Sequence, residues 1–260
     1  MKLSACITIN DREISVLDTV FSSMRDQEHD EFIIVMDRAP LALTEYVSRW
    51  WKDDKRTKLI LLTGTSGWRS PVKAWNRGYE AVTGDQLYCF SSETVQAVGN
   101  LAKARELLTS IPQSLLFGKC ECSCGPYGQE VNWNGTAPGN LLCDSAHPRP
   151  LGFIWAGPMA NVRQIGGWDE EFDRGLWYDE TDFFLRLWRT GLDFVFDDSV
   201  SGTHLHHPRP VLETAEGAAL TRINEAYLLR KHGVKAQIAP QHVLTNPGRT
   251  IWLNPYRTVG

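Results

Sequence analysis

The sequence predicts an α/β domain with a mixed, mainly parallel sheet flanked by helices. The first observation is a series of short, continuous apolar runs, which is typical of parallel strands buried on both faces of a sheet. The second is that a run of helical periodicity separates each apolar run from the next. Strands that alternate with helices indicate parallel βαβ units, and such sheets bind ligands at the carboxyl ends of their strands.

The first half of the chain carries the clearest of these units. The predicted strands cover residues 3–10, 32–36, 59–62 and 87–90. The predicted helices between them cover about 13–27, 41–52 and 70–84. Asp11 is suited to cap the first helix, and Pro71 stands at a favourable first position of the third. Gly84 is a typical residue just after a helix end.

The second half is less regular. We predict helices at about 96–111, 158–165, 178–190 and 213–232, ordered structure at 153–155 and a strand at 194–196. Residues 120–150 are rich in Gly, Pro and Asn without a period, so we expect a long loop or an irregular hairpin. Segments of this length often form lids or contact substrates. The tail from 240 to 260 is expected to be irregular.

Charge and composition exclude some classes of protein. The formal net charge is -4 and the sequence pI is about 6.0, so the chain has no broad basic surface for nucleic acid. Residues 1–9 are too short and too polar downstream for a signal peptide, and no run has the length of a transmembrane helix. We therefore expect a cytoplasmic protein.

Four of the six cysteines, Cys120, Cys122, Cys124 and Cys143, are grouped in the second half. Zinc sites usually have spacers of two residues or more, so the Cys-x-Cys-x-Cys spacing is a weak metal signal. Free thiols on a loop or strand are the favoured interpretation in a reducing cytosol.

Two acidic motifs follow the irregular segment. GGWDEEF occupies residues 166–172, DETDFFLRL occupies 179–187, and a histidine stands at 204. A helix dipole stabilises carboxylates in the first turn, and carboxylates in a pocket can act as bases. The order resembles the acceptor-side signature of family-2 glycosyltransferases of the GT-A fold: GGFDE, then ED-x-D-L-x-x-R, then His. Here the Glu–Asp pair is swapped to Asp179–Glu180.

The resemblance implies a domain division. A GT-A catalytic domain would occupy residues 1–210, with a nucleotide-sugar half at about 1–95 and an acceptor half at about 96–210. A C-terminal helix and the irregular tail would occupy 211–260. AWNRG at 74–78 and AVTGD at 81–85 resemble the family's A-R-N-x-G and A-x-G-D, so the likeness extends through most of this domain.

The resemblance also implies a divalent cation, Mn²⁺ or Mg²⁺. The Asp-x-Asp metal motif of the GT-A fold matches SSE at 91–93, where Glu93 keeps the second acidic position and Ser91 replaces the first. His204 matches the histidine that often completes the metal shell, and His206 and His207 stand close to it. A metal in this place neutralises the charge that develops on the leaving diphosphate.

The nucleotide side of the donor site is implied by residues at strand ends. Asp37 matches the acidic position that contacts the uracil or ribose of the donor, and carboxylates accept such hydrogen bonds. The further donor-binding candidates are Thr8, Asn10, Arg69, Lys73 and Ser91. The donor would be a UDP- or GDP-linked sugar, and the acceptor a glycan or another hydroxyl compound.

The catalytic base is implied by the swapped pair. Residue by residue, Glu180 takes the place of the family's base, and Asp179 fills the neighbouring position as the second catalytic candidate. Asp182 lies four residues before Arg186, which favours an ion pair on one helix face. Asn76 and Asp85 are expected to bond to local backbone.

Three functions fit these motifs. The favoured one is an inverting glycosyltransferase. The second is a non-catalytic GT-A-like domain that binds nucleotide-sugar or glycan, which Ser91 in the metal motif supports. The third is a nucleotidyltransferase, which would need a glycine-rich loop after the first strand, and residues 10–13 contain no glycine.

Overall fold

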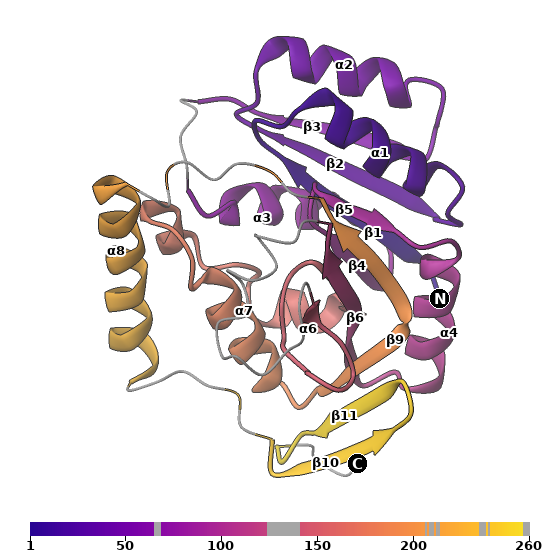
Figure 1. The fold of residues 1–260 in the computed structure, drawn as a ribbon, viewed down its shortest axis with the longest axis vertical. Coiled ribbons are helices and arrows are strands. Elements are labelled where there is room, and N and C mark those ends of the chain that lie inside the picture. The colour runs from indigo at the N-terminus through magenta and orange to yellow at the C-terminus, as the bar shows by residue number, and fades with distance from the viewer. Residues whose placement is uncertain are drawn as a thin grey trace.

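The computed structural model describes residues 1–64, 69–123, 141–205, 207, 211, 214–233, 238 and 240–256. Over these residues the chain folds into one mixed sheet with helices on both faces (Figure 1). The predicted mixed α/β architecture is therefore confirmed. Within the described ranges, every helix is either too short or too polar to be a candidate membrane span.

The sheet contains eleven strands within the described ranges, in the order β10-β11-β9-β6-β8-β4-β1-β2-β3, with β5 beside β9 and β7 beside β6. The strands are β1 (Leu3–Ile9), β2 (Glu31–Asp37), β3 (Thr57–Leu62), β4 (Gln86–Phe90), β5 (Thr94–Gln96), β6 (Ser114–Cys122), β7 (Leu141–Cys143), β8 (Ile154–Pro158), β9 (Asp193–His204), β10 (His242–Asn246) and β11 (Arg249–Leu253).

Helices cover both faces of the sheet. They are α1 (Ile14–Arg25), α2 (Leu41–Trp51), α3 (Val72–Ala81), α4 (Asn100–Ser110), α6 (Met159–Gln164), the 3₁₀ helix η1 (Glu170–Arg174), α7 (Asp179–Trp188) and α8 (Ala215–His232). The core on one face contains side chains of α1, α2 and α4, and the core on the other contains side chains of α3, α6 and α7. Strand β1 shows the division, since Ile7 faces the first core and Cys6 the second.

The predicted parallel units form one half of the sheet. β4, β1, β2 and β3 are neighbours in that order and run parallel to one another. Their carboxyl ends therefore meet at one edge, as expected for βαβ units. The other half is mixed, because β8 runs antiparallel to both β4 and β6 while β9 runs parallel to β6.

The segment predicted as a long loop or irregular hairpin begins within a strand. β6 extends to Cys122 and pairs antiparallel with β7, where Cys120 stands opposite Cys143. Cys120, Cys122 and Cys143 are buried free thiols on these two strands. Residues 124–140, including Cys124, lie outside the described residues.

The expectation of an irregular tail is wrong for residues 242–253. β10 and β11 form a hairpin around Gly248, whose φ of 74° suits a glycine turn, and β11 pairs with β9. Trp252 packs on Phe196 of β9 with ring centroids 4.8 Å apart. β11 pairs with a strand that is far away in the chain, so local sequence does not reveal this contact. β10 is exposed along its whole length, so it lacks the alternation of buried and exposed residues that predicts a strand.

Candidate functional site

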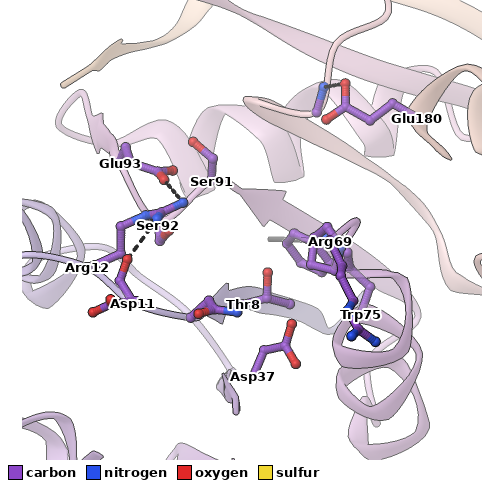
Figure 2. Close-up of a pocket in the computed structure, with 13 residues that line it drawn as sticks. Thr8, Asp11, Arg12, Asp37, Arg69, Trp75, Ser91, Ser92, Glu93 and Glu180 are labelled. Carbon is purple, nitrogen blue, oxygen red and sulfur yellow. Dashed lines mark hydrogen bonds and ion pairs between the residues drawn. The ribbon is translucent and has the colours of Figure 1, made fainter. Parts of the chain in front are cut away.

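A pocket of about 360 Å³ opens at the carboxyl ends of β1, β2 and β4 (Figure 2). Its volume lies in the range of small-molecule sites. The lining residues are mainly polar or charged: Thr8, Asn10, Asp11, Arg12, Asp37, Arg69, Pro71, Trp75, Ser91, Ser92, Glu93, Gly152 and Glu180. The pocket therefore lies where a doubly wound α/β sheet binds its ligands.

Five of the six donor-binding candidates line this pocket: Thr8, Asn10, Asp37, Arg69 and Ser91. Lys73, the sixth, is not among the lining residues. Its ammonium contacts Asp173 of η1 at 2.7 Å instead. The first turn of α3 directs Lys73 toward η1, a long-range arrangement that the sequence pattern does not reveal.

Asp37 is held by its neighbour in the chain. The guanidinium of Arg38 donates to both carboxylate oxygens of Asp37, at 2.7 and 3.1 Å, and also lies 3.5 Å from Asp173. These carboxylates raise the pKa of Arg38. Arg38 has a φ of 54°, a backbone conformation that costs a non-glycine residue free energy and that often marks functional sites. The end of β2 therefore presents a fixed carboxylate to the pocket.

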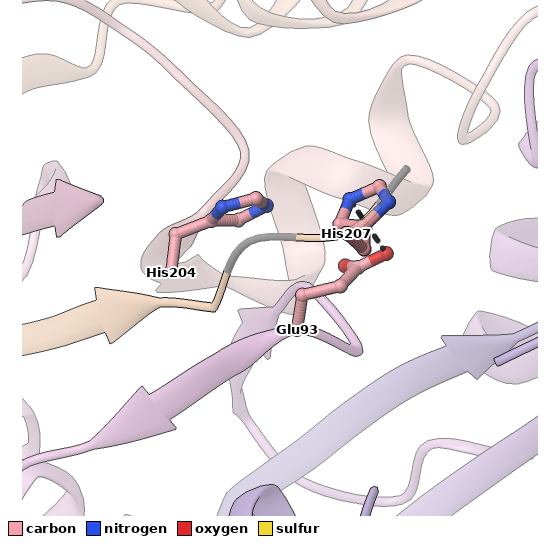
Figure 3. A group of neighbouring side chains, drawn as sticks. All are labelled: Glu93, His204 and His207. Atoms are coloured by element: carbon pink, nitrogen blue, oxygen red, sulfur yellow. Dashed lines mark ion pairs between the residues drawn. The ribbon is translucent and has the colours of Figure 1, made fainter. Parts of the chain in front are cut away.

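Glu93, His204 and His207 form a buried cluster that could hold a metal ion (Figure 3). One ligand atom from each lies within 4.8 Å of the others, and His207 Nε2 lies 3.4 Å from Glu93 Oε1. One carboxylate and two imidazoles are ligands that Mn²⁺ and similar ions accept, and the adjoining pocket leaves room for further oxygen ligands. The residues therefore fit a divalent cation.

Strand pairing creates this cluster. β5 pairs antiparallel with β9, with Thr94 opposite His204, so the residue before β5 and the end of β9 meet. The amide of Leu205 donates to the carbonyl of Glu93 at 2.7 Å and fixes this approach. The sequence indicated Glu93 and His204 as ligands. It did not select His207 over His206, and His206 lies outside the described residues.

Arg12, which follows β1, contacts the same carboxylate. Its guanidinium forms an ion pair with Glu93 and donates to the Ser92 hydroxyl at 3.3 Å and to the Asp11 carbonyl at 2.8 Å. Arg12 is not among the site residues predicted from the sequence. The signal that could have found it is its position just beyond the carboxyl end of the first strand.

The two catalytic candidates occupy different places. Glu180 lines the pocket, and its Oε2 accepts a hydrogen bond from the Gly152 amide at 3.2 Å. A Cβ at position 152 would lie 2.4 Å from Glu180 Oε1, so a side chain there would displace the carboxylate from its present position. Asp179 is buried, hydrogen-bonded to Ser70 and absent from the pocket lining. Burial raises the pKa of Asp179 to about 6. The pocket-facing carboxylate is thus that of Glu180.

The GGW turn is held by Asn76 of α3. Its side chain donates to the Trp168 carbonyl at 2.9 Å and accepts from the Trp168 amide at 2.8 Å. Gly167 has a φ of 74°, and a Cβ there would lie 2.4 Å from the Asn76 side chain. Asn76 is therefore structural, as predicted, but its partner is a distant segment and not local backbone.

The turn into α7 has an unusual backbone. Trp177 and Tyr178 have φ values of 64° and 65°, which L side chains rarely adopt. Asn224 of α8 is fully buried and donates to the carbonyls of Trp177 and Phe172, both at 3.0 Å. These contacts stabilise a costly conformation immediately before Asp179 and Glu180.

Asp182 is buried and contacts three basic side chains, not one. The predicted contact with Arg186 is present at 2.7 Å, but the carboxylate is fully buried. Lys231 and His232 of α8 each contact its Oδ1 at 2.7 Å. The assignment to an ordinary helix-face pair is therefore incomplete, because Asp182 joins α8 to α7.

Trp75 and Gly152 are further lining residues that the sequence analysis did not select. Trp75 stacks on Trp168 with centroids 6.2 Å apart, and Trp168 stacks on Phe183 at 4.1 Å. Trp75 thus combines an aromatic core contact with a place in the pocket wall. Most tryptophans pack in cores, so the residue type alone does not indicate this role.

No protein-family model matches the chain, and no curated protein matches it in sequence. Solved structures do match. The mannosyltransferase PcManGT from Pyrobaculum calidifontis, in complex with GDP-Man and Mn²⁺, has a TM-score of 0.60 and 16% identity; the match covers 88% of this chain and 64% of that one.

GalNAc-T7, with UDP, GalNAc and Mn²⁺, has a TM-score of 0.59 and 12% identity, with 89% of this chain and 51% of that chain covered. S. aureus TarS 1-349, with UDP-GlcNAc, has a TM-score of 0.61 and 12% identity, with 89% and 72% covered. The chain thus spans less than two thirds of the first two proteins. These likenesses show a GT-A glycosyltransferase-like fold, which confirms the predicted fold; family 2 stays a prediction.

Proposed function

We propose that the chain is an inverting hexosyltransferase that moves a sugar from a UDP- or GDP-linked donor to a hydroxyl group of an acceptor such as a glycan. The observation that carries the proposal is that Glu180 and Glu93 line one pocket at the carboxyl ends of the parallel strands. In this proposal Glu180 is the base for the acceptor and Glu93 is a ligand of a divalent ion, so that the two functions share one site. In this proposal residues 1–95 form most of the donor side and 96–210 the acceptor side.

The donor nucleotide is assigned to the end of the pocket beside Asp37. The fixed carboxylate of Asp37 accepts hydrogen bonds from the base or ribose, and Thr8 and Asn10 line the same region. Arg69 lines the pocket with its side chain 43% exposed, which leaves the guanidinium accessible to phosphate.

A divalent cation, Mn²⁺ or Mg²⁺, is assigned to Glu93, His204 and His207. When bound, such an ion supplies positive charge against the diphosphate leaving group. Ser91, at the first position of the metal motif, lines the pocket but adds no charge. We therefore expect the protein alone to bind the ion weakly.

Glu180 is assigned as the base. As the acceptor oxygen attacks the anomeric carbon, the Glu180 carboxylate takes the hydroxyl proton, and the bond from the anomeric carbon to the diphosphate oxygen breaks. Attack on the face opposite the leaving group inverts the configuration. The Gly152 amide orients the carboxylate through a hydrogen bond to Oε2.

A screen of nucleotide-sugars tests this function. UDP- and GDP-sugars are incubated with the protein in Mn²⁺ or in excess chelator, and donor hydrolysis and calorimetric affinity are measured. We expect one donor class to be hydrolysed, with higher affinity in Mn²⁺. Affinity without turnover, even with a panel of acceptors, would favour a non-catalytic nucleotide-sugar-binding protein. Equal affinity in chelator would reject the metal role of Glu93.

A further inference from the structure

We propose that Arg12 is a displaceable guard of the cation site: its guanidinium occupies Glu93 until a divalent ion takes the carboxylate, and the released guanidinium then binds the donor diphosphate. The second step rests on the proposed function, whereas the first does not. The roles assigned to Glu93, His204 and His207 leave the purpose of Arg12 unexplained, although Arg12 contacts the cluster directly.

The guanidinium is held by three contacts. One terminal nitrogen pairs with Glu93 Oε1, Nε donates to the Ser92 hydroxyl at 3.3 Å, and the other terminal nitrogen donates to the Asp11 carbonyl at 2.8 Å. The side chain of Arg12 is only 20% exposed. A charge pair that is mostly removed from water is stronger and less screened by salt than a surface pair.

Arg12 and a divalent ion exclude each other at Glu93. Arg12 pairs with Oε1 of Glu93 (Figure 2). His207 Nε2 approaches the same oxygen at 3.4 Å (Figure 3). An ion bound between these residues would stand beside the guanidinium, and two cations at contact distance repel each other strongly in a buried site. Binding of an ion at Oε1 therefore requires Arg12 to leave that oxygen.

The displaced guanidinium could bind the donor diphosphate in the same pocket. Arg12 lines the same pocket as Thr8, Asp37 and Ser91 (Figure 2). When the ion replaces it at Glu93, the local charge rises by two, on the donor side of the pocket. A diphosphate carries the opposite charge, and a guanidinium donates to two phosphate oxygens at once. Nucleotide-diphosphate binding would therefore stabilise the displaced position of Arg12.

Manganese titration of the full chain tests the first step without nucleotide. Free Mn²⁺ is followed by electron paramagnetic resonance for the wild type, Arg12→Gln, Arg12→Lys and Arg77→Gln. Arg77 is an exposed arginine that pairs with Glu80 and does not line the pocket. Arg77→Gln is therefore the matched control, because it removes one positive charge away from the site. We expect Arg12→Gln to bind Mn²⁺ about tenfold more tightly, which is about 1.4 kcal/mol, and Arg77→Gln to bind it as the wild type does.

Arg12→Lys keeps the charge but cannot contact Ser92 and Glu93 at the same time. We therefore expect its Mn²⁺ affinity to rise, but by less than that of Arg12→Gln. Arg12→Lys also tests the guard role if Arg12→Gln does not fold. The guard role is overturned if the Arg12 variants bind Mn²⁺ no more tightly than the wild type, or if no protein binds Mn²⁺ at millimolar concentration.

Calorimetry with UDP and GDP at saturating Mn²⁺ tests the second step. We expect Arg12→Gln to bind the nucleotide about tenfold more weakly, the opposite direction to its Mn²⁺ affinity. Unchanged nucleotide affinity overturns the second step. If Arg12→Gln gains Mn²⁺ affinity but neither nucleotide binds the wild type, the guard role is supported and the proposed function fails.

Discussion

Replacing Glu180 by Gln is expected to lower kcat for sugar transfer by about 10²–10⁴-fold, the contribution typical of a positioned base. Gln keeps the shape and the hydrogen bond from the Gly152 amide but cannot accept a proton. Donor affinity should stay within about twofold, since Glu180 is not assigned to the nucleotide. Steady-state transfer kinetics and calorimetric donor titration measure the two quantities separately.

Asp179→Asn is the matched control, since it removes a carboxylate from the adjacent position. Asp179 is buried beside Ser70 and outside the pocket lining, and burial raises its pKa to about 6. A pKa near neutrality would suit a base, but the carboxylate does not line the pocket, so we expect transfer by this variant at near the parent rate. If Asp179→Asn is inactive while Glu180→Gln is active, Asp179 is the base. If neither change slows transfer, the proposed mechanism is wrong.

Asp182→Asn is expected to lower the free energy of unfolding by about 3–5 kcal/mol, the usual cost of removing one partner from a buried ion pair. The carboxylate is fully buried and contacts Arg186, Lys231 and His232. Its loss leaves these groups without their shared anion and weakens the contact between α7 and α8. Urea denaturation at neutral pH measures the change.

Glu171→Gln is the control for this prediction. Glu171 forms an exposed pair with Arg174 at 3.1 Å, three residues apart on η1. We expect a change below about 0.5 kcal/mol, because exposed pairs contribute little. A loss of less than about 1 kcal/mol for Asp182→Asn would show that the buried network does not stabilise the fold as argued.

The parallel half of the fold was predictable because its signals are local. β1, β2, β3 and β4 are short apolar runs, and each is separated from the next by a helix whose apolar face is visible in the sequence. The mixed half depends on pairing between distant segments. β9 continues to His204 through polar residues because β5 and β6 pair with it, whereas the sequence indicated only its first apolar residues.

The site residues also divide into those with a local sequence signal and those that depend on contacts between distant segments. Asp37 and Glu93 could be selected because each lies at or just beyond the end of an apolar strand and matches a position of the resembled family, and Glu180 because of its motif. Lys73, by contrast, was assigned to the donor from its position in the chain, and its contact with Asp173 depends on where η1 folds. His207 and Arg12 reach Glu93 from separate segments, so no local spacing indicates either contact.

A crystal structure with Mn²⁺ and UDP or GDP would show whether the proposed site binds both metal and nucleotide, because anomalous scattering locates the manganese independently of the protein atoms. We expect a manganese signal at Glu93, His204 and His207, with the nucleotide in the adjoining pocket beside Asp37. Manganese or nucleotide bound elsewhere, with this pocket empty at saturating concentrations of both, would contradict it.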